Sequence, residues 1–133
     1  MQITNDKLIT EAIKTASFAY APYSQFSVGA ALLTTDGRIF CGCNVENLSY
    51  GLTICAERSA VFAAVAAGCQ NFQKIAIVAD TEEPISPCGA CRQVLAEFHP
   101  AMEIILANFK GKSEQFILSE LLPRPSKGIL GRP

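Results

Sequence analysis

Charge of either sign is scarce in this chain of 133 residues, which has 11 lysines and arginines against 12 acidic residues and a net charge of −1 at pH 7. A protein that binds the phosphate backbone of a nucleic acid carries an excess or a stripe of basic residues. The sequence has neither. We therefore expect a small-molecule partner and no nucleic acid.

Long hydrophobic runs are also missing. The longest, residues 60–67, is far shorter than the roughly 20 apolar residues of a membrane-spanning helix. Residues 1–14 mix polar and apolar side chains without the hydrophobic segment of a signal peptide. We expect no membrane partner and a cytoplasmic location, where the six cysteines are metal ligands or buried thiols rather than disulfides.

Internal repeats and low-complexity segments are absent as well. Half of the residues are apolar, and a chain of this length can bury a substantial core within one domain. Prolines and glycines concentrate near the C-terminus. We predict a single domain over residues 1–123 and an extended tail over residues 124–133.

Hydrophobic periodicity predicts helices that alternate with strands after an initial hairpin. Asp36-Gly37 is a hairpin turn signal, and the strand before it is apolar on both faces, so helices must cover both sides of the sheet. These features predict an α/β domain with a mixed sheet. The predicted helices span residues 4–20, 55–68, 88–98 and 119–122, and the predicted strands span residues 26–33, 38–43, 75–79, 103–107 and 115–117.

Two short motifs stand where the second and third predicted helices begin. They are Cys55-Ala56-Glu57-Arg58 and Pro87-Cys88-Gly89-Ala90-Cys91. Cys88 and Cys91 are three residues apart, so they share one face of a helical turn and can bind one metal ion. With Cys55 they supply three thiolates, which leaves one position of a tetrahedral zinc ion open. The sequence thus predicts a zinc site.

Glu57 makes this a candidate reaction centre. A carboxylate beside a metal-activated water can take a proton from it and return the proton to a substrate. This order of motifs, a metal ligand two residues before a glutamate and then Pro-Cys-x-x-Cys, is the signature of zinc deaminases. The polar loop over residues 44–53 leads directly into Cys55, so it is a candidate wall of a substrate pocket.

Three thiolates on Zn²⁺ leave a net negative charge, which nearby cations can offset. Arg58 and Arg92 are the available cations, and we favour Arg58 as the partner of the thiolates. The chain's only histidine, His99, falls at a predicted helix end and on the wrong side of that helix to be a fourth ligand. Cys41, Cys43 and Cys69 are interpreted as buried thiols.

Several alternatives remain open at this point. A structural zinc protein would leave Glu57 without a role and would lack an open coordination position. A thiol redox protein would function without metal, because Cys-x-x-Cys alone also occurs in redox motifs. A deaminase could also act on a polynucleotide, which the charge argues against, or on a modified cytosine nucleoside or nucleoside antibiotic.

Along nearly its whole length the sequence resembles the small homotetrameric branch of the cytidine deaminase family. The resemblance implies a three-layer α/β/α sandwich with a five-stranded mixed sheet. It also implies one zinc ion per chain, held by Cys55, Cys88 and Cys91, with Glu57 as the proton carrier. The motifs that carry it are residues 20–24, 26–32, 44–47, 55–58, 87–93 and 120–123.

The same resemblance implies the reaction and the substrate contacts. Water would replace ammonia at C4 of the cytosine ring, so that cytidine and deoxycytidine become uridine and deoxyuridine in pyrimidine salvage. Asn44 and Glu46 would hold the ribose hydroxyls, and Phe26 would pack on the pyrimidine. The backbone N–H of Ala56 would meet the ring carbonyl, and Tyr50 would help to build a pocket in a neighbouring subunit.

The C-terminal tail departs from the family pattern. Family members place a phenylalanine three residues after Leu-Leu-Pro, where it closes over the base from an adjacent subunit, whereas this chain has Ser126 there. Because stacking on an aromatic ring contributes about 1–3 kcal/mol in nucleic-acid binders, we expect a more open pocket. Similar Michaelis constants for cytidine and a bulky 5′-substituted analogue would support that expectation.

Overall fold

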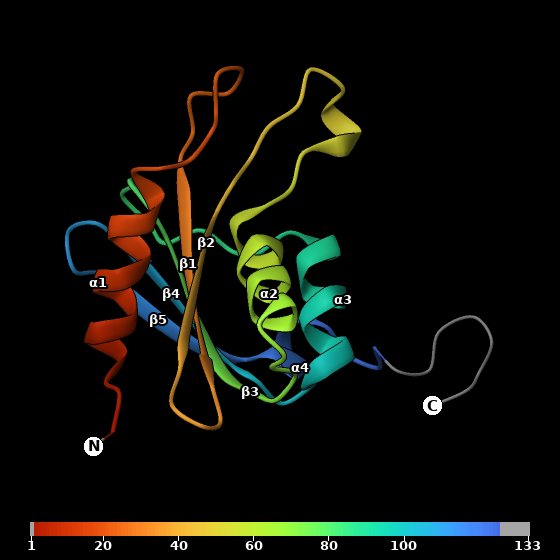
Figure 1. Cartoon of the computed structure of the whole chain (residues 1–133). Coiled ribbons are helices and arrows are strands. Elements are labelled where there is room, and N and C mark those ends of the chain that lie inside the picture. Colours follow the sequence, from red (N-terminus) through yellow and green to blue (C-terminus); the bar gives the residue numbers. More distant parts are fainter. Residues whose placement is uncertain (1, 126–133) are drawn as a thin grey trace.

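A computed structural model describes residues 2–125, and Figure 1 follows them from α1 to α4. The predicted position of Ser126 lies outside the described residues. None of the described helices has the length and apolar character needed to cross a membrane. The elements are α1 (Asn5–Ala16), β1 (Val28–Thr34), β2 (Ile39–Cys43), η1 (Tyr50–Leu52), α2 (Ala56–Ala66), β3 (Phe72–Ala79), α3 (Gly89–Phe98), β4 (Glu103–Asn108), β5 (Ser113–Ile117) and α4 (Leu118–Leu121).

The five strands form one mixed sheet in the order β2-β1-β3-β4-β5. β1 pairs antiparallel with both β2 and β3, β3 pairs parallel with β4, and β4 pairs antiparallel with β5. The parallel pair requires a crossover, which α3 provides. The predicted mixed sheet is confirmed.

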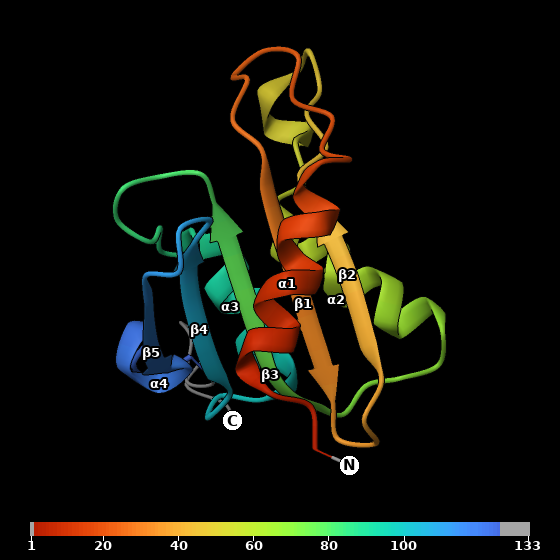
Figure 2. The same ribbon diagram turned by 90° about the vertical axis from the view of Figure 1, so that its left-hand side faces the viewer.

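Helices cover both faces of this sheet, as the two views in Figures 1 and 2 show. α1 lies on one face, where Leu8 and Ala12 pack against Ala31 and Leu33 of β1 and their neighbours. α2 and α3 lie on the other face, over the core cluster that includes Leu32. All seven residues of β1 are buried, as expected for a strand covered on both sides. The three-layer α/β/α sandwich is confirmed.

Two glycines set how closely the helices approach the sheet. A Cβ atom at Gly29 would lie 1.9 Å from the carbonyl oxygen of Ala12 in α1. A Cβ atom at Gly42 would lie 2.4 Å from the backbone nitrogen of Ala60 and 2.5 Å from the carbonyl oxygen of Ala56 in α2. The absence of side chains at these positions therefore lets α1 and α2 pack directly on the strands.

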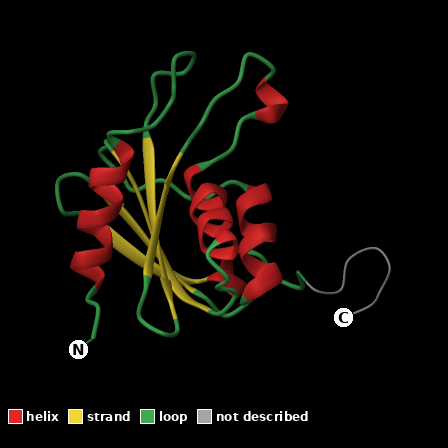
Figure 3. Ribbon diagram, viewed as in Figure 1, coloured by secondary structure: helices red, strands yellow, loops and turns green. Residues whose placement is uncertain are grey.

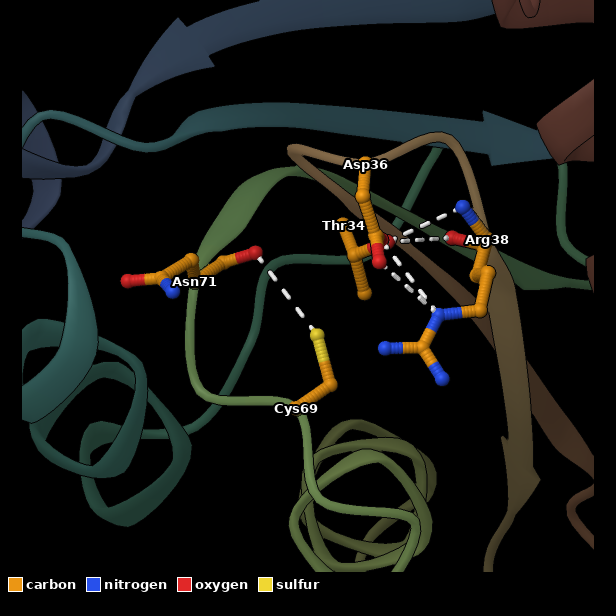
Figure 4. Close-up of polar contacts among 5 residues, drawn as sticks. All are labelled: Thr34, Asp36, Arg38, Cys69 and Asn71. Atoms are coloured by element: carbon orange, nitrogen blue, oxygen red, sulfur yellow. Dashed lines mark hydrogen bonds and ion pairs between the residues drawn. The ribbon is translucent and has the colours of Figure 1, made fainter.

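The predicted β1–β2 hairpin is present at the end of the sheet drawn in Figure 4. Gly37 has a φ of 87°, and the backbone nitrogen of Thr34 donates to the carbonyl of Arg38 at 2.9 Å. The Asp36 carboxylate accepts from the Thr34 hydroxyl and pairs with Arg38 at 3.1 Å. Cys69, beside this hairpin, is 6% exposed and is a buried thiol as predicted.

Some predicted boundaries were wrong. α1 ends at Ala16 rather than near Tyr20, because the Tyr20 backbone bonds instead to Asn44 and Glu46 in the loop after β2. β1 begins two residues later than predicted, since the Asn44 amide holds the Phe26 carbonyl. β3 begins at Phe72, three residues earlier than predicted, because its pairing with β1 extends to Thr34.

Candidate metal centre

Cys55 and Cys88 are the N-cap residues of α2 and α3, and Cys91 lies in the first turn of α3. The two helices run side by side on one face of the sheet, and Figure 3 shows the loops that lead into them at the same end of the molecule. Both N-cap residues have extended rather than helical dihedral angles, so each thiol belongs to the residue that precedes the first turn of its helix. The tertiary packing of α2 beside α3 therefore brings together thiols that are 33 residues apart in the sequence.

The three sulfur atoms fit one zinc ion. The Cys55 and Cys88 Sγ atoms are 3.8 Å apart, and the Cys88 and Cys91 Sγ atoms are 3.4 Å apart. A tetrahedral zinc site with Zn–S bonds of about 2.3 Å requires S–S distances of about 3.8 Å. Within residues 2–125 these cysteines form the one cluster of His, Cys, Asp and Glu side chains suited to a metal ion, and it offers three ligands.

The surroundings of the cluster favour the thiolate form at one sulfur. A hydrogen bond from Cys91, assisted by Arg58, lowers the pKa of Cys55 to about 5 although the side chain is half-buried. The same bond and burial raise the pKa of Cys91. The backbone nitrogen of Cys91 donates to the Cys88 sulfur at 3.4 Å. Because metal ligands must be deprotonated, zinc binding here releases protons.

The two candidate arginines have different partners. Arg58 Nη2 donates to the Cys55 sulfur at 3.4 Å, while its Nε is buried without a hydrogen-bond partner among the described residues. Arg92 donates from Nε to the carbonyl of Pro87 and from Nη1 to the carbonyl of Leu121, both at 2.8 Å. Arg58 is therefore placed to offset thiolate charge, whereas Arg92 joins the loop before Cys88 to α4.

Glu57 lies in the first turn of α2 and is only 4% exposed. Burial raises the pKa of its carboxyl group, and the negative charge of Cys55 adds to this effect. A buried carboxyl group of raised pKa holds a proton more readily near neutral pH than an exposed one. Glu57 is thus suited to accept and return a proton beside the sulfur cluster.

A cavity of about 250 Å³ opens beside Glu57 and contains most of the predicted site residues. Tyr50 lines an adjoining hollow of about 390 Å³, which shares Ser24, Glu46 and Thr53 with the cavity, and its ring meets Tyr23 edge-on at 6.1 Å. Arg58 lines neither space. The cavity is lined by Ser24, Phe26, Val28, Asn44, Glu46, Thr53, Cys55, Ala56, Glu57, Ile85, Ser86 and Cys88.

Asn44 and Glu46 tie the loop after β2 to the loop before β1. Asn44 accepts from the Val28 backbone nitrogen and donates to the Phe26 carbonyl, both at 2.8 Å. Glu46 Oε1 accepts from the backbone nitrogens of Tyr23 at 3.0 Å and Ser24 at 3.1 Å, and Oε2 accepts from the Ser24 hydroxyl. These contacts hold together two of the segments that line the cavity.

Thr53, in the loop predicted as a pocket wall, lines this cavity, and so does Ser24, which sequence reasoning did not single out. Ser24 lies in a loop, where no periodic pattern indicates which way a side chain points. The available signal for Ser24 was its position two residues before Phe26, in the segment that precedes the first strand. The interpretation of Cys41 and Cys43 as buried thiols is only partly right, because both are half-buried on β2. His99 is the C-cap of α3, as predicted.

A larger hollow of about 660 Å³ lies beside α1, lined by Ile13, Lys14, Asp80, Phe109 and their neighbours. It contains none of the three clustered thiols and shares only Phe26 with the cavity beside Glu57. Although this hollow is larger than the cavity beside Glu57, it is therefore not the candidate reaction centre.

Comparisons with known proteins agree with this geometry. The family model described as "Cytidine and deoxycytidylate deaminase zinc-binding region" matches residues 2–107. A cytidine deaminase of Sporosarcina psychrophila is 55% identical over 119 residues, which are 89% of this chain and 88% of that protein. A cytidine deaminase of Halalkalibacterium halodurans is 54% identical, over 87% of this chain and 89% of that protein.

A solved structure shares the fold. The crystal structure of cytidine deaminase from Burkholderia pseudomallei superposes with a TM-score of 0.89 at 51% sequence identity. The match covers 92% of this chain and 98% of that chain. Sequence and structure thus point to the same set of relatives over nearly the full length.

Proposed function

The chain belongs to the cytidine and deoxycytidylate deaminase family, and from that premise we propose that it converts cytidine and deoxycytidine hydrolytically into uridine and deoxyuridine with release of ammonia. The observation that carries this proposal is the position of Glu57, buried in the same cavity as Cys55 and Cys88. A structural zinc site has no use for a buried carboxyl group there.

Cys55, Cys88 and Cys91 hold one zinc ion per chain. When bound, zinc supplies Lewis-acid activation of a water molecule. Arg58 offsets part of the negative charge of the thiolates through its contact with the Cys55 sulfur. The N-termini of α2 and α3 act in the same direction, because their free N–H groups favour thiolate over thiol.

Glu57 moves the protons of the reaction. Its carboxylate takes a proton from the attacking water as the oxygen adds to C4, and it passes that proton to N3 of the ring. A second proton, released when the C4 oxygen becomes a carbonyl, passes through the same carboxyl group to the amine. The amine then leaves as ammonia, so one group serves as base and acid.

The cavity wall binds the nucleoside. Asn44 and Glu46 hold the ribose hydroxyls, Phe26 packs on the pyrimidine ring, and the backbone N–H of Ala56 donates to the ring carbonyl. Ala56 occupies the first turn of α2, where backbone N–H groups have no partner within the helix. The carboxylate of Glu46 would repel a phosphate, so a free nucleoside is the substrate rather than a nucleotide.

The protein works as a homotetramer with pockets shared between subunits. Large apolar side chains are exposed on the loop that contains Tyr50, with Leu48 79%, Tyr50 74% and Leu52 65% exposed. On α2, Phe62 is also 50% exposed. Exposed apolar surface of this extent is typical of protein interfaces, and Tyr50 then contributes to a neighbouring pocket.

A single catalytic domain comprises residues 1–123, followed by a tail over residues 124–133. The six cysteines are free, which suits a cytoplasmic protein that participates in pyrimidine salvage.

Zinc content and the ultraviolet absorbance of substrates test this function together. We expect one zinc per chain and a rapid loss of absorbance with cytidine and deoxycytidine, but not with cytidine monophosphate. Zinc without turnover would redirect the search to another amino-substituted heterocycle. Carefully reduced protein that binds no zinc would contradict the proposal.

A further inference from the structure

The hydroxyl group of Ser24 stands between two residues of the proposed nucleoside pocket. It donates to Glu46 Oε2 and accepts from the backbone nitrogen of Phe26 at 3.0 Å. Ser24 lines both the cavity beside Glu57 and the adjoining hollow. Its single proton is therefore committed to the Glu46 carboxylate, with its oxygen held in place by Phe26.

The shape of the loop before β1 makes this contact possible. The Gln25 backbone nitrogen donates to the Ala21 carbonyl at 3.0 Å, and Gln25 has a φ of 56°, in the left-handed region. This tight turn presents the backbone nitrogens of Tyr23 and Ser24 to Glu46 Oε1. The loop thus directs three donors from two consecutive residues at one carboxylate.

Three donors leave Glu46 with little freedom. An ionised carboxylate has about four acceptor positions, so the loop occupies all but about one of them. The Ser24 hydroxyl is the donor that fixes Oε2, because the two backbone donors both reach Oε1. Without that hydroxyl, Oε1 would still bind the loop, but no contact would fix the position of Oε2 and hence the orientation of the carboxylate plane.

We propose that Ser24 is a positioning residue that orients the Glu46 carboxylate toward a 2′- or 3′-hydroxyl of the sugar and so sets the preference for nucleosides that carry one. This inference rests on the proposed function, in which Glu46 binds the sugar. Ser24 itself acts through Glu46 and need not touch the substrate. Substrates without 2′- and 3′-hydroxyls gain nothing from the orientation.

The side chain of Ser24 is exposed, so its removal opens no void in the core. Two backbone donors continue to hold the loop to Glu46 in its absence. A purely structural role would change folding stability and affect all substrates alike. The positioning role instead predicts an effect that depends on the sugar.

The test compares zinc-loaded Ser24→Ala with wild type on cytidine and on 2′,3′-dideoxycytidine. We expect KM for cytidine to rise about tenfold, as for the loss of one hydrogen bond to a charged group, with little change in kcat. KM for dideoxycytidine should stay within about twofold. Ser24→Thr keeps the hydroxyl and should restore cytidine binding.

Ser27→Ala is the matched control, since Ser27 lies in the same loop and lines the hollow beside α1 rather than the Glu57 cavity. It should behave as wild type. Ser24→Ala combined with Glu46→Gln should bind cytidine no more weakly than Glu46→Gln alone, because both changes remove one interaction. Additive effects, or equal losses on both substrates, would overturn the positioning role.

Calorimetric titration of both nucleosides into zinc-loaded wild type and Ser24→Ala separates this inference from the proposed function. If wild type turns over neither nucleoside, the proposed function fails. A loss of cytidine affinity specific to Ser24→Ala would still support the positioning role. Equal affinities in the two proteins would refute it whatever the turnover.

Discussion

Two groups of cysteines in this molecule have similar spacing and very different surroundings. Cys88 and Cys91, joined by Cys55, converge at the N-termini of α2 and α3, with Arg58 against one sulfur. Cys41 and Cys43 lie two residues apart on β2 and belong to no metal-binding cluster within residues 2–125. Close spacing of two thiols is therefore not sufficient for a metal site.

Cys41 and Cys43 on β2 lack the surroundings that favour a thiolate in the three-cysteine cluster. Burial raises the pKa of both Cys41 and Cys43, and Cys41 packs beside the cluster of apolar residues under α1. Neither occupies a helix N-terminus, and no third thiol approaches them among the described residues. A helix N-terminus and a guanidinium favour a thiolate, whereas an apolar strand face favours a thiol.

Removing a zinc ligand should have the largest effect. Cys91→Ser should bind zinc more than about 100-fold more weakly, because losing a ligand costs more than losing an outer partner. Zinc per chain should then fall from about one to near zero on dialysis, and deaminase activity should disappear with it. Cys43→Ser is the matched control and should retain both zinc and activity. Zinc loss from both variants would show that Cys43 also contributes to metal binding.

Glu57→Gln should separate metal binding from catalysis. The amide keeps the shape of the side chain but cannot carry a proton, so kcat should fall by about 10³-fold or more. Zinc content should remain at one per chain, because the three sulfur ligands are unchanged. Metal analysis and steady-state rates on the same preparation check this. Substantial remaining turnover would show that another group moves the proton.

Gly42 lies between Cys41 and Cys43 on β2, and α2 packs directly against it. Because Cys55 caps α2, a change at Gly42 can reach the three-cysteine cluster. Gly42→Ala would push against the backbone of Ala56 and Ala60, and overpacking of this kind costs about 1–3 kcal/mol. We expect a lower unfolding temperature together with weaker zinc binding, because α2 carries Cys55. Gly29→Ala strains α1 instead and should lower stability while leaving zinc affinity largely intact. Equal zinc loss in both variants would argue against a local effect.

The contribution of Arg58 should be smaller. Arg58→Gln removes the charge beside the Cys55 sulfur and should weaken zinc binding by about 10-fold to 100-fold, as for other outer partners of a metal site. Competition with a chelator measures this. Arg38→Gln, which removes an exposed arginine paired with Asp36, is the control and should leave zinc affinity unchanged.

The smallest effect concerns the reactivity of the pair on β2. Thiolate is the form that reacts with iodoacetamide, and burial raises the pKa of Cys41 and Cys43 above their ordinary value. In the zinc-loaded protein both should resist labelling at pH 7, and labelling should increase only at a pH higher than an ordinary exposed cysteine requires. Peptide mass analysis across this pH range measures the extent of labelling at each cysteine. Rapid labelling of either residue at pH 7 would be inconsistent with its burial.

The elements that were predicted best are those whose signal is local. The helix starts at Cys55 and Cys88 and the Asp36-Gly37 hairpin depend on capping and turn preferences within a few residues. The end of α1 could not be predicted in the same way. Tyr20 leaves the helix because its backbone bonds to residues 44 and 46, and that pairing exists only once the loops are folded together.

In the candidate site, too, residues with a local sequence signal were predicted and residues whose role depends on distant contacts were not. Spacing and residue type were enough to identify the candidate ligands Cys55, Cys88 and Cys91. Three cysteines with this spacing at two predicted helix starts indicate a zinc site more strongly than any other role. Ser24 was not identified, since a loop serine has no local signal for its partner. Its contact with Glu46 depends on the left-handed turn at Gln25 and on the position of a loop 22 residues away.

The sequence by itself determined the candidate zinc-ligand motifs, the candidate proton carrier Glu57, and the alternation of strands and helices that makes a mixed sheet. These properties follow from side-chain chemistry and from periodicity along the chain. Only the tertiary structure decided that three thiols fall within 4.8 Å of one another, that Arg58 rather than Arg92 meets sulfur, and that Ser24 fixes Glu46. The reason is that Cys55 meets Cys88, Arg92 meets Leu121 and Ser24 meets Glu46 across segments that are far apart in the sequence, so no local preference determines whether they come together.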